Sequence, residues 1–278
     1  MPSTAVQPAD RADPVDIDID IDAERRWLES LRRRYHHRRF LSPDPLEAVY
    51  DYDAARDREI VAFIAASLAY GNVKAMLPAI RAVLDALAPS PTASILTPRP
   101  PLRVRFRAFR YRFTSGAQLT ALLAAIAHLI HHHGSLHASF TRHLNPKDTT
   151  IIDALGRFVD DLHRAAPLPL AHLIPHPAAG SACKRLNLFL RWMVRRDEID
   201  PGGWTGVNPS RLIMPLDTHV YQIAHARRWT QRRTPDLKTA LHITDRLRTI
   251  HPTDPLRYDF AITRPGIRRE VLPDGCRG

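Results

Sequence analysis

The hydrophobic and polar positions of this chain repeat mainly with a helical period. Apolar residues recur three and four positions apart in long runs, as expected for one buried face of an α-helix. The run 57–70 is apolar around most of its circumference, which indicates a core helix, and Gly71 is placed to end it. Strand signals are few. The pattern predicts an all-α globule with helices over 23–39, 57–70, 74–87, 116–133, 150–165, 182–194, 218–226 and 237–250.

The segments between these runs are rich in proline. The stretch 89–101 has the composition of a semi-extended connector. At the start of the chain, residues 16–22 alternate aspartate with isoleucine, and their like charges favour disorder over a strand. We therefore expect a disordered acidic tail over 1–22 and a single helical domain over 23–278.

Composition limits the class of protein further. No window approaches the roughly 18 uninterrupted apolar residues of a membrane helix, and residues 1–22 lack the basic and then apolar pattern of a signal peptide. We expect a cytoplasmic monomer that does not bind membranes. Two cysteines, Cys183 and Cys276, are too few for an all-cysteine zinc site or an iron–sulfur cluster, so no cofactor is predicted. Cys183 has no evident activating partner and is expected to be a small packing residue.

The charge is large and unevenly spread. The chain carries a formal net charge of +11, of which residues 1–22 contribute −5, so residues 23–278 carry +16. Such a charge attracts polyanions, chiefly through release of their counterions, and nucleic acid is the first partner to consider. The alternative is a protein that is merely basic.

Three polar segments each leave two interpretations open. Segment 103–113 interleaves arginines with aromatic rings, which suits contacts to phosphates and bases, or else an amphipathic element with its rings in the core. Segment 195–200 (RRDEID) is either a phosphate-facing arginine pair with balancing acids or, as we favour, a solvated salt-bridge loop. A histidine cluster has some i,i+4 spacings typical of metal ligands. It contains no carboxylate and precedes Gly134, so we predict polar residues near a helix end and no metal site there: His128, His131, His132, His133, His137 and His143.

The strongest chemical signal is Lys184 together with Asp217. Lys184 follows a short apolar run (168–174) and a turn rich in proline, alanine and glycine (175–180), an order typical of two helices joined by a tight hairpin. The free N–H groups at the start of the second helix can hold a backbone phosphate. The same positive helix end disfavours an ammonium ion, and burial would add to this, leaving a neutral amine that can act as a nucleophile. Asp217 alone would be a helix N-cap.

The segment GSACKRLNLFL (180–190) resembles the hairpin and catalytic-lysine helix of the helix-hairpin-helix DNA glycosylase superfamily. A pair of hairpin glycines, a lysine and an asparagine three residues later recur there, and Gly180, Ala182, Lys184 and Asn187 hold those places here. The run LDTHV (216–220) resembles the catalytic-aspartate motif. The 33 positions from Lys184 to Asp217 are closer to the archaeal oxidised-guanine glycosylases than to the iron–sulfur endonucleases. After residue 23 the chain is similar to an uncharacterised bacterial family placed in this superfamily, in the stretches DREIVAFIAASLAYG, KRLNLFLRWMVRRDEIDPGGW, LIMPLDTH and DPLRYDFAITRPGI.

The resemblance implies a fold of two helical lobes, with the hairpin and catalytic helix at about 166–196, and a DNA repair N-glycosylase with AP lyase activity. Lys184 would attack C1′ of a flipped nucleotide, release a damaged purine such as oxidised guanine, and form a Schiff base, while Asp217 assists. The implied partner is damaged duplex DNA, with RNA as an alternative. The implied DNA contacts are Gly180, Ser181, Ala182, Arg185 and Asn187. Candidates for a base pocket, although we favour core packing for each, are Trp204, His219, Tyr258, Asp259 and Phe260.

The chain departs from the superfamily pattern at two points. Ala182 replaces a hairpin glycine, which affects how closely a phosphate approaches the backbone. No four-cysteine cluster follows, which selects a branch without an iron–sulfur module. Two other functions stay open: a non-catalytic DNA- or RNA-binding protein of the same fold, and an enzyme that uses the same pair on a nucleoside or nucleotide.

Overall fold

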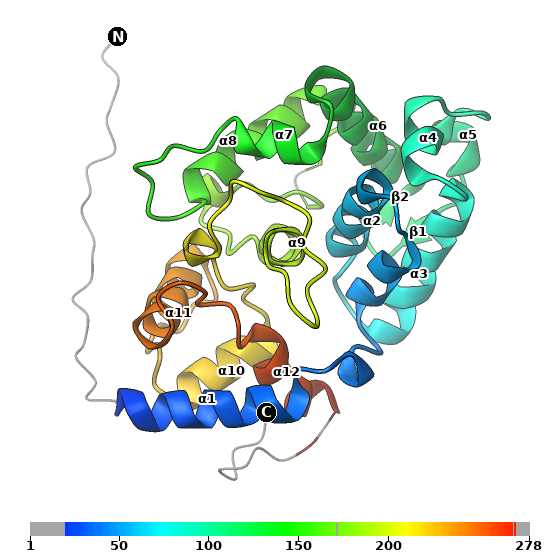
Figure 1. Ribbon diagram of the computed structural model, residues 1–278. Helices are drawn as coiled ribbons and strands as arrows, with labels where there is room; N and C mark the ends of the chain where they lie inside the picture. Colours follow the sequence, from blue (N-terminus) through cyan, green and yellow to red (C-terminus); the bar gives the residue numbers. More distant parts are fainter. Residues whose placement is uncertain (1–19, 171, 269, 271–278) are drawn as a thin grey trace.

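Helices make up most of the described chain (Figure 1). The computed structural model describes residues 20–170, 172–268 and 270. The first half forms, with η marking a 3₁₀ helix, α1 (Ile21–Tyr35), η1 (Arg38–Phe40), η2 (Pro45–Asp51), α2 (Ala55–Ser67), α3 (Val73–Leu87), α4 (Pro91–Leu96), α5 (Leu102–Arg105) and α6 (Gly116–His133). The second half forms α7 (Leu136–Thr141), α8 (Ile152–Ala165), η3 (Pro177–Ala179), α9 (Lys184–Val194), η4 (Pro209–Arg211), α10 (Thr218–Ala226), α11 (Leu237–Ile250) and α12 (Asp259–Arg268). The prediction of a mostly helical protein is confirmed.

A small β-hairpin lies between α5 and α6. Strands β1 (Arg110–Tyr111) and β2 (Thr114–Ser115) pair antiparallel, with Arg110 opposite Ser115. No helix in the described ranges is both long enough and apolar enough to cross a membrane.

The helices form two groups that meet along α9 (Figure 1). In the first group, α2 packs against η2, α4 and α9, and α6 packs against α7 and α8. In the second, α1 packs against α11 and α12, and α10 packs against α12. The first helix of the chain therefore joins the last three. One continuous cluster of buried apolar side chains extends through both groups.

Helix α9 occupies the centre and is seen end-on in Figure 1. Its apolar residues Leu186, Phe189 and Leu190 recur at helical spacing and are buried. Phe189 meets Phe63 of α2 edge to face, with ring centroids 4.9 Å apart. On another side, Arg191 reaches α12 and pairs with Asp259. The helix thus contacts both groups, and its position determines where Lys184 lies.

Several helix boundaries follow directly from capping residues. Ser115 caps α6 in a capping box with Gln118, and Gly134 ends it with φ +84°, so the predicted 116–133 agrees with the structure. Helix α2 is shorter than predicted. It ends at Ser67, because Ala69 N–H bonds to Ala66 and Tyr70 N–H to Leu68, which tightens the chain before Gly71.

Two segment predictions need correction. Residues 21 and 22 belong to α1, which Asp20 caps by accepting hydrogen bonds from Asp22 and Ala23; the rest of the predicted acidic tail, 1–19, lies outside the described residues. The proline-rich stretch 89–101 contains α4. Ser90 caps this helix and Pro91 is its first residue, where the missing N–H of proline costs nothing.

Glu59 is a buried carboxylate that joins three segments. It accepts hydrogen bonds from the backbone N–H of Leu136 (2.9 Å) and His137 (2.7 Å), in the first turn of α7. It also accepts the indole N–H of Trp204 at 2.7 Å. Burial raises the pKa of Glu59, against these three hydrogen bonds, which lower it. The side chain thus holds α2, α7 and the loop after α9 together.

Removing this carboxylate should destabilise the protein. The Glu59→Ala variant leaves three buried N–H donors without an acceptor, and we expect the free energy of unfolding to fall by about 3 kcal/mol or more. Urea denaturation followed by circular dichroism measures this. Glu47→Ala, which removes an exposed carboxylate, is the matched control and should change stability by less than about 0.5 kcal/mol. Equal effects in the two variants would contradict the role given to Glu59.

Candidate active site at the start of helix α9

The chain before α9 forms a hairpin-like turn whose first arm differs from the prediction. The apolar run 168–174 was expected to be a helix, but its described residues form only one helical turn, in which Ile174 N–H bonds to Leu170 O at 2.8 Å. Pro169 and Pro175 flank this run and limit its length. The short helix η3 follows and ends at Gly180, whose φ of +77° is left-handed.

The entry into α9 requires a second left-handed residue. Cys183 is the N-cap, with φ +46°, a conformation that is unusual for a residue with a Cβ. Ala182 itself does not adopt a positive φ, so the substitution of the expected hairpin glycine at this position causes no backbone strain. The Cys183 side chain gives the helix no capping hydrogen bond and instead donates to Pro175 O at 3.3 Å.

Lys184 is the first residue of α9 and faces Asp217. Its Nζ lies 3.8 Å from Asp217 Oδ2, and the two side chains are 37% and 22% exposed. The prediction that Lys184 is buried is therefore wrong. A lysine open on one side can be reached by a substrate, whereas a fully buried amine cannot.

The two oxygens of Asp217 have different partners. Oδ1 accepts the backbone N–H of Val220 at 2.8 Å, which caps α10, while Oδ2 is the atom nearest to Lys184. The capping role and the lysine-facing role therefore coexist in one carboxylate. Such a partly exposed ion pair adds only about 0.2–1 kcal/mol to stability.

Lysine is rare in this chain, which carries 36 arginines and only four lysines. The other three, Lys74, Lys147 and Lys238, are exposed. Of the four, Lys184 alone has a carboxylate oxygen of the described residues within 4 Å. Arginine remains protonated and cannot act as a nucleophile, whereas a lysine amine can lose its proton.

Arg185 holds the start of α9 rather than facing outward. Its guanidinium donates to Ser67 O at the end of α2 (2.7 Å) and to His172 O, and it lies over the ring of Tyr70. Burial lowers the pKa of Arg185. Because Arg185 donates to both carbonyls, it holds the start of α9 in place. The structure does not place it as the predicted DNA contact.

The other predicted DNA contacts of the hairpin also make hydrogen bonds within the protein. Asn187 is buried, and its amide donates to Ala182 O at 2.9 Å, so it shapes the turn and does not face a DNA strand. Ser181 Oγ accepts Cys183 N–H at 3.2 Å. Gly180 is exposed, and its carbonyl accepts Leu237 N–H at 2.9 Å. Of the predicted DNA contacts, Gly180 is exposed and Ser181 is partly exposed, whereas Ala182 and Asn187 are buried.

Four of the five base-pocket candidates are core residues. Trp204, Tyr258, Asp259 and Phe260 are 6%, 1%, 3% and 2% exposed, so none of them is open to an extrahelical base. Tyr258 donates to Glu29, Phe260 lies beneath Arg264, and Asp259 pairs with Arg191. Core packing, the alternative for these residues, is what the structure shows. His219 is half-buried, lies two positions after Asp217, and has a buried Nδ1 with no partner among the described residues.

The basic segment 103–113 combines both of its predicted roles. Phe106 and Tyr111 are buried, whereas Phe113 at the tip of the β1–β2 hairpin is 74% exposed. Tyr70 connects this hairpin to the candidate site, because its hydroxyl donates to Tyr111 O at 3.0 Å and its ring lies under Arg185. The exposed arginines of this segment are Arg103, Arg107, Arg110 and Arg112.

The histidine cluster is distributed over several local contacts. His128 stacks on His132, His137 bonds to Thr205 O at 2.7 Å, and His143 bonds to Asp161 at 2.7 Å. No three His, Cys, Asp or Glu side chains in the described ranges are placed to hold a metal ion.

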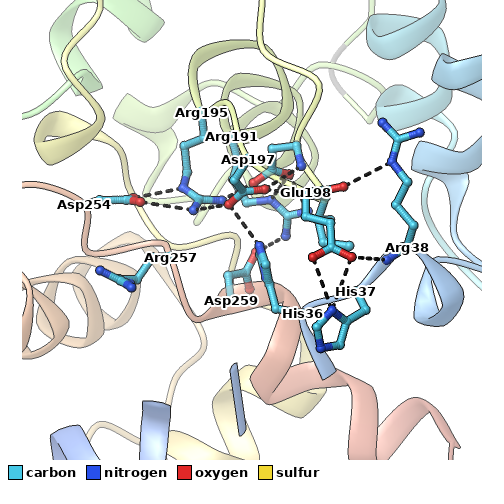
Figure 2. Close-up of polar contacts among 12 residues, drawn as sticks. His36, His37, Arg38, Arg191, Arg195, Asp197, Glu198, Asp254, Arg257 and Asp259 are labelled. Atoms are coloured by element: carbon cyan, nitrogen blue, oxygen red, sulfur yellow. Dashed lines mark hydrogen bonds and ion pairs between the residues drawn. The ribbon is translucent and has the colours of Figure 1, made fainter. Parts of the chain in front are cut away.

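The segment 195–200 contains the group that the sequence interpretation missed. Arg195 and Asp200 are buried, at 4% and 0% exposed, so this is not a solvated salt-bridge loop. Figure 2 shows how Arg191 and Arg195 extend into a set of carboxylates. Arg191 contacts Asp200 and Asp259, and Arg195 contacts Asp197, Asp200 and Asp254. The sequence signal was one arginine near the end of an otherwise apolar helix and a second arginine directly after the helix.

The family of the chain follows from a family model. The model described as "Protein of unknown function (DUF2400)" matches residues 44–268. The chain therefore belongs to this family. No significant match was found among curated proteins or among solved structures.

We also expect the thiol of Cys183 to be unreactive. Cys183 is 1% exposed, and burial raises its pKa to about 11. In the Cys276→Ser variant, Cys183 should react with iodoacetamide at pH 8 at least about 100-fold more slowly than free cysteine, because little thiolate forms. Mass spectrometry of timed samples measures the rate, and unfolding in guanidinium is the control that should restore it. A native rate within tenfold of free cysteine would contradict the buried N-cap.

Proposed function

We propose that this protein is a DNA N-glycosylase with AP lyase activity, in which Lys184 is the nucleophile and Asp217 accepts its proton. The observation that carries the proposal is the 3.8 Å approach of Lys184 Nζ to Asp217 Oδ2, with the lysine partly open to solvent. The substrate class, a damaged purine with oxidised guanine as the first candidate, rests on the resemblance to glycosylases.

The chemistry needs a neutral amine and an accessible sugar. Once Asp217 takes a proton from Lys184, the Nζ lone pair forms a bond to C1′ of the nucleotide. The bond from C1′ to the base breaks, and the base leaves with that electron pair and gains a proton from solvent. The C1′–O4′ bond then opens, O4′ is protonated, and an imine joins C1′ to Nζ. Loss of a C2′ proton expels the 3′ phosphate and nicks the strand.

The energetics favour a chemical role for the pair over a structural one. An ion pair this exposed contributes little to stability, and Asp217 would cap α10 equally well without a lysine beside it. In a chain that uses arginine at nine of ten cationic positions, an amine at the start of the central helix is the residue that nucleophilic chemistry requires.

Surface charge near the site suits a nucleic acid. Segment 103–113 exposes four arginines and Phe113, and Arg112 lies against the Phe113 ring. The β1–β2 hairpin, which carries Arg110, Arg112 and Phe113, is tied to Arg185 through Tyr70. Arginine side chains bind phosphates, and an exposed ring can stack on a base or enter a base step. These features support DNA as the partner, with the nucleophile Lys184 at the start of α9 next to Arg185.

The first test is covalent trapping. Wild-type protein with a duplex that carries 8-oxoguanine or an abasic site should form a borohydride-stable complex, and Lys184→Gln should form none. Lys238→Gln is the matched control, because Lys238 is exposed, also lies in the first turn of a helix, and should trap as wild type does. Lys184→Gln should keep its melting temperature, since the lysine is partly exposed. Trapping and excision by Lys184→Gln would contradict the proposal, and so would salt-sensitive binding without any product across a lesion panel.

A second test separates the two functions of Asp217. Asparagine keeps the Oδ1 acceptor that caps α10 but loses the charge toward Lys184, so Asp217→Asn should fold normally. The excision rate should fall by about 10²–10⁴-fold, as when a general base is lost. Asp236→Asn is the matched control, because Asp236 caps α11 in the same way and also pairs with an arginine, Arg232. If the two variants lose the same activity, Asp217 has no chemical role.

A further inference from the structure

A small basic pocket lies at the opposite end of α9 from Lys184. Its cavity volume is about 230 Å³, and three segments supply its charged lining. These side chains are Arg32 of α1, Arg195, Arg196 and Asp197 after α9, and Asp254 and Arg257 before α12. The 11 residues of α9 separate this pocket from Lys184 by about 16 Å along the helix. It is therefore distinct from the candidate active site.

The two aspartates of the pocket already pair with Arg195. Asp254 accepts both Nε and Nη2 of Arg195, at 2.8 and 3.0 Å (Figure 2). Asp197 accepts Arg195 Nη2 at 2.7 Å and lies 3.0 Å from His36 Nε2. Burial alone would raise the pKa of Asp197, but His36 and Arg195 outweigh it and hold that pKa far below its usual range. Because Asp197 and Asp254 accept hydrogen bonds from Arg195, they do not pair with Arg32 or Arg196 of the pocket.

Those other arginines have donors to spare. Arg32 and Arg196 make no ion pair with any residue of the described ranges. Arg257 is partly engaged, because it lies 3.4 Å from Glu29 and its Nη1 contacts His251 Nε2. The Nε atoms of Arg32 and Arg257 are buried and have no hydrogen-bond partner within the described chain. A guanidinium group that lines an open cavity and has no carboxylate partner can bind an anion, and Arg32 and Arg196 are such groups in this pocket.

We infer that this pocket binds a phosphate group. Guanidinium groups from three directions suit the oxygens of a tetrahedral anion. The cavity is smaller than the roughly 300–1,000 Å³ typical of drug-sized ligands, which favours a small anion such as phosphate. The phosphate comes either from the backbone of a bound nucleic acid or from a free ion. Neither source requires chemistry at Lys184.

The test uses the full chain in the Lys184→Gln background, so that its result is independent of the proposed glycosylase activity. Inorganic phosphate is titrated by calorimetry at constant ionic strength against chloride. Arg32→Gln and Arg196→Gln remove unpaired arginines of the pocket. Arg233→Gln is the matched control, since Arg233 is exposed and lines a different basic concavity. Circular dichroism checks that each variant is folded.

Two results support the inference and distinguish the sources. Saturable phosphate binding that weakens at least tenfold in Arg32→Gln and Arg196→Gln, but not in Arg233→Gln, assigns a free phosphate. If the free ion does not bind, a short DNA duplex should lose affinity in the same two variants. The slope of log affinity against log salt should then fall by about one per lost contact, which assigns a backbone phosphate.

Two other results would overturn it. If phosphate and duplex bind equally well with and without the Arg32→Gln and Arg196→Gln changes, these arginines bind no anion. Equal losses in Arg233→Gln and the pocket variants show that only the overall positive charge matters.

Discussion

The fold depends on two guanidinium groups buried at the end of the central helix. Arg191 lies in the last turn of α9 and Arg195 is the residue just after the helix; both contact Asp200, which is fully buried. Burial lowers the pKa of each arginine, but the surrounding carboxylates raise it by more, so both remain charged. Removing one partner of such a buried group would leave an uncompensated charge, at a typical cost of about 3–5 kcal/mol. This network attaches α9 to α12 and to the loop before it.

The same helix is fixed at its other end by a different device. Arg185 bonds to the carbonyl that ends α2, while Asn187 bonds back to Ala182 O in the turn. Between the two ends, the apolar face of α9 packs on α2. Lys184 is thus set in position by its neighbours on the helix, and its own contact with Asp217 adds little to stability. At the start of α9, Arg185 is thus a structural residue, while the adjacent Lys184 is available for chemistry.

Sequence patterns were sufficient wherever local signals determine structure. The end of α6 at Gly134, the N-cap Asp217 before α10 and the helical spacing of apolar residues in α9 are all readable from neighbouring residues. The approach of Lys184 to Asp217 was expected from family resemblance, because no local pattern links positions 33 residues apart. The roles of Arg185 and Asn187 were mistaken, since the sequence around a candidate nucleophile does not show whether a neighbouring polar side chain faces solvent or the core. Burial depends on the packing of distant helices, and it was the missing information at Arg195, Asp200 and Lys184 alike.

The family has no assigned activity, so the proposed function depends on the amine of Lys184. The most direct measurement is to map the site of attachment in a borohydride-trapped complex with lesion-bearing DNA, by proteolysis and mass spectrometry. The chain contains only four lysines, which makes the assignment unambiguous. The account predicts that the sugar remnant is found on Lys184. Attachment to Lys74, Lys147, Lys238 or the terminal amine, or no attachment with any lesion, would contradict it.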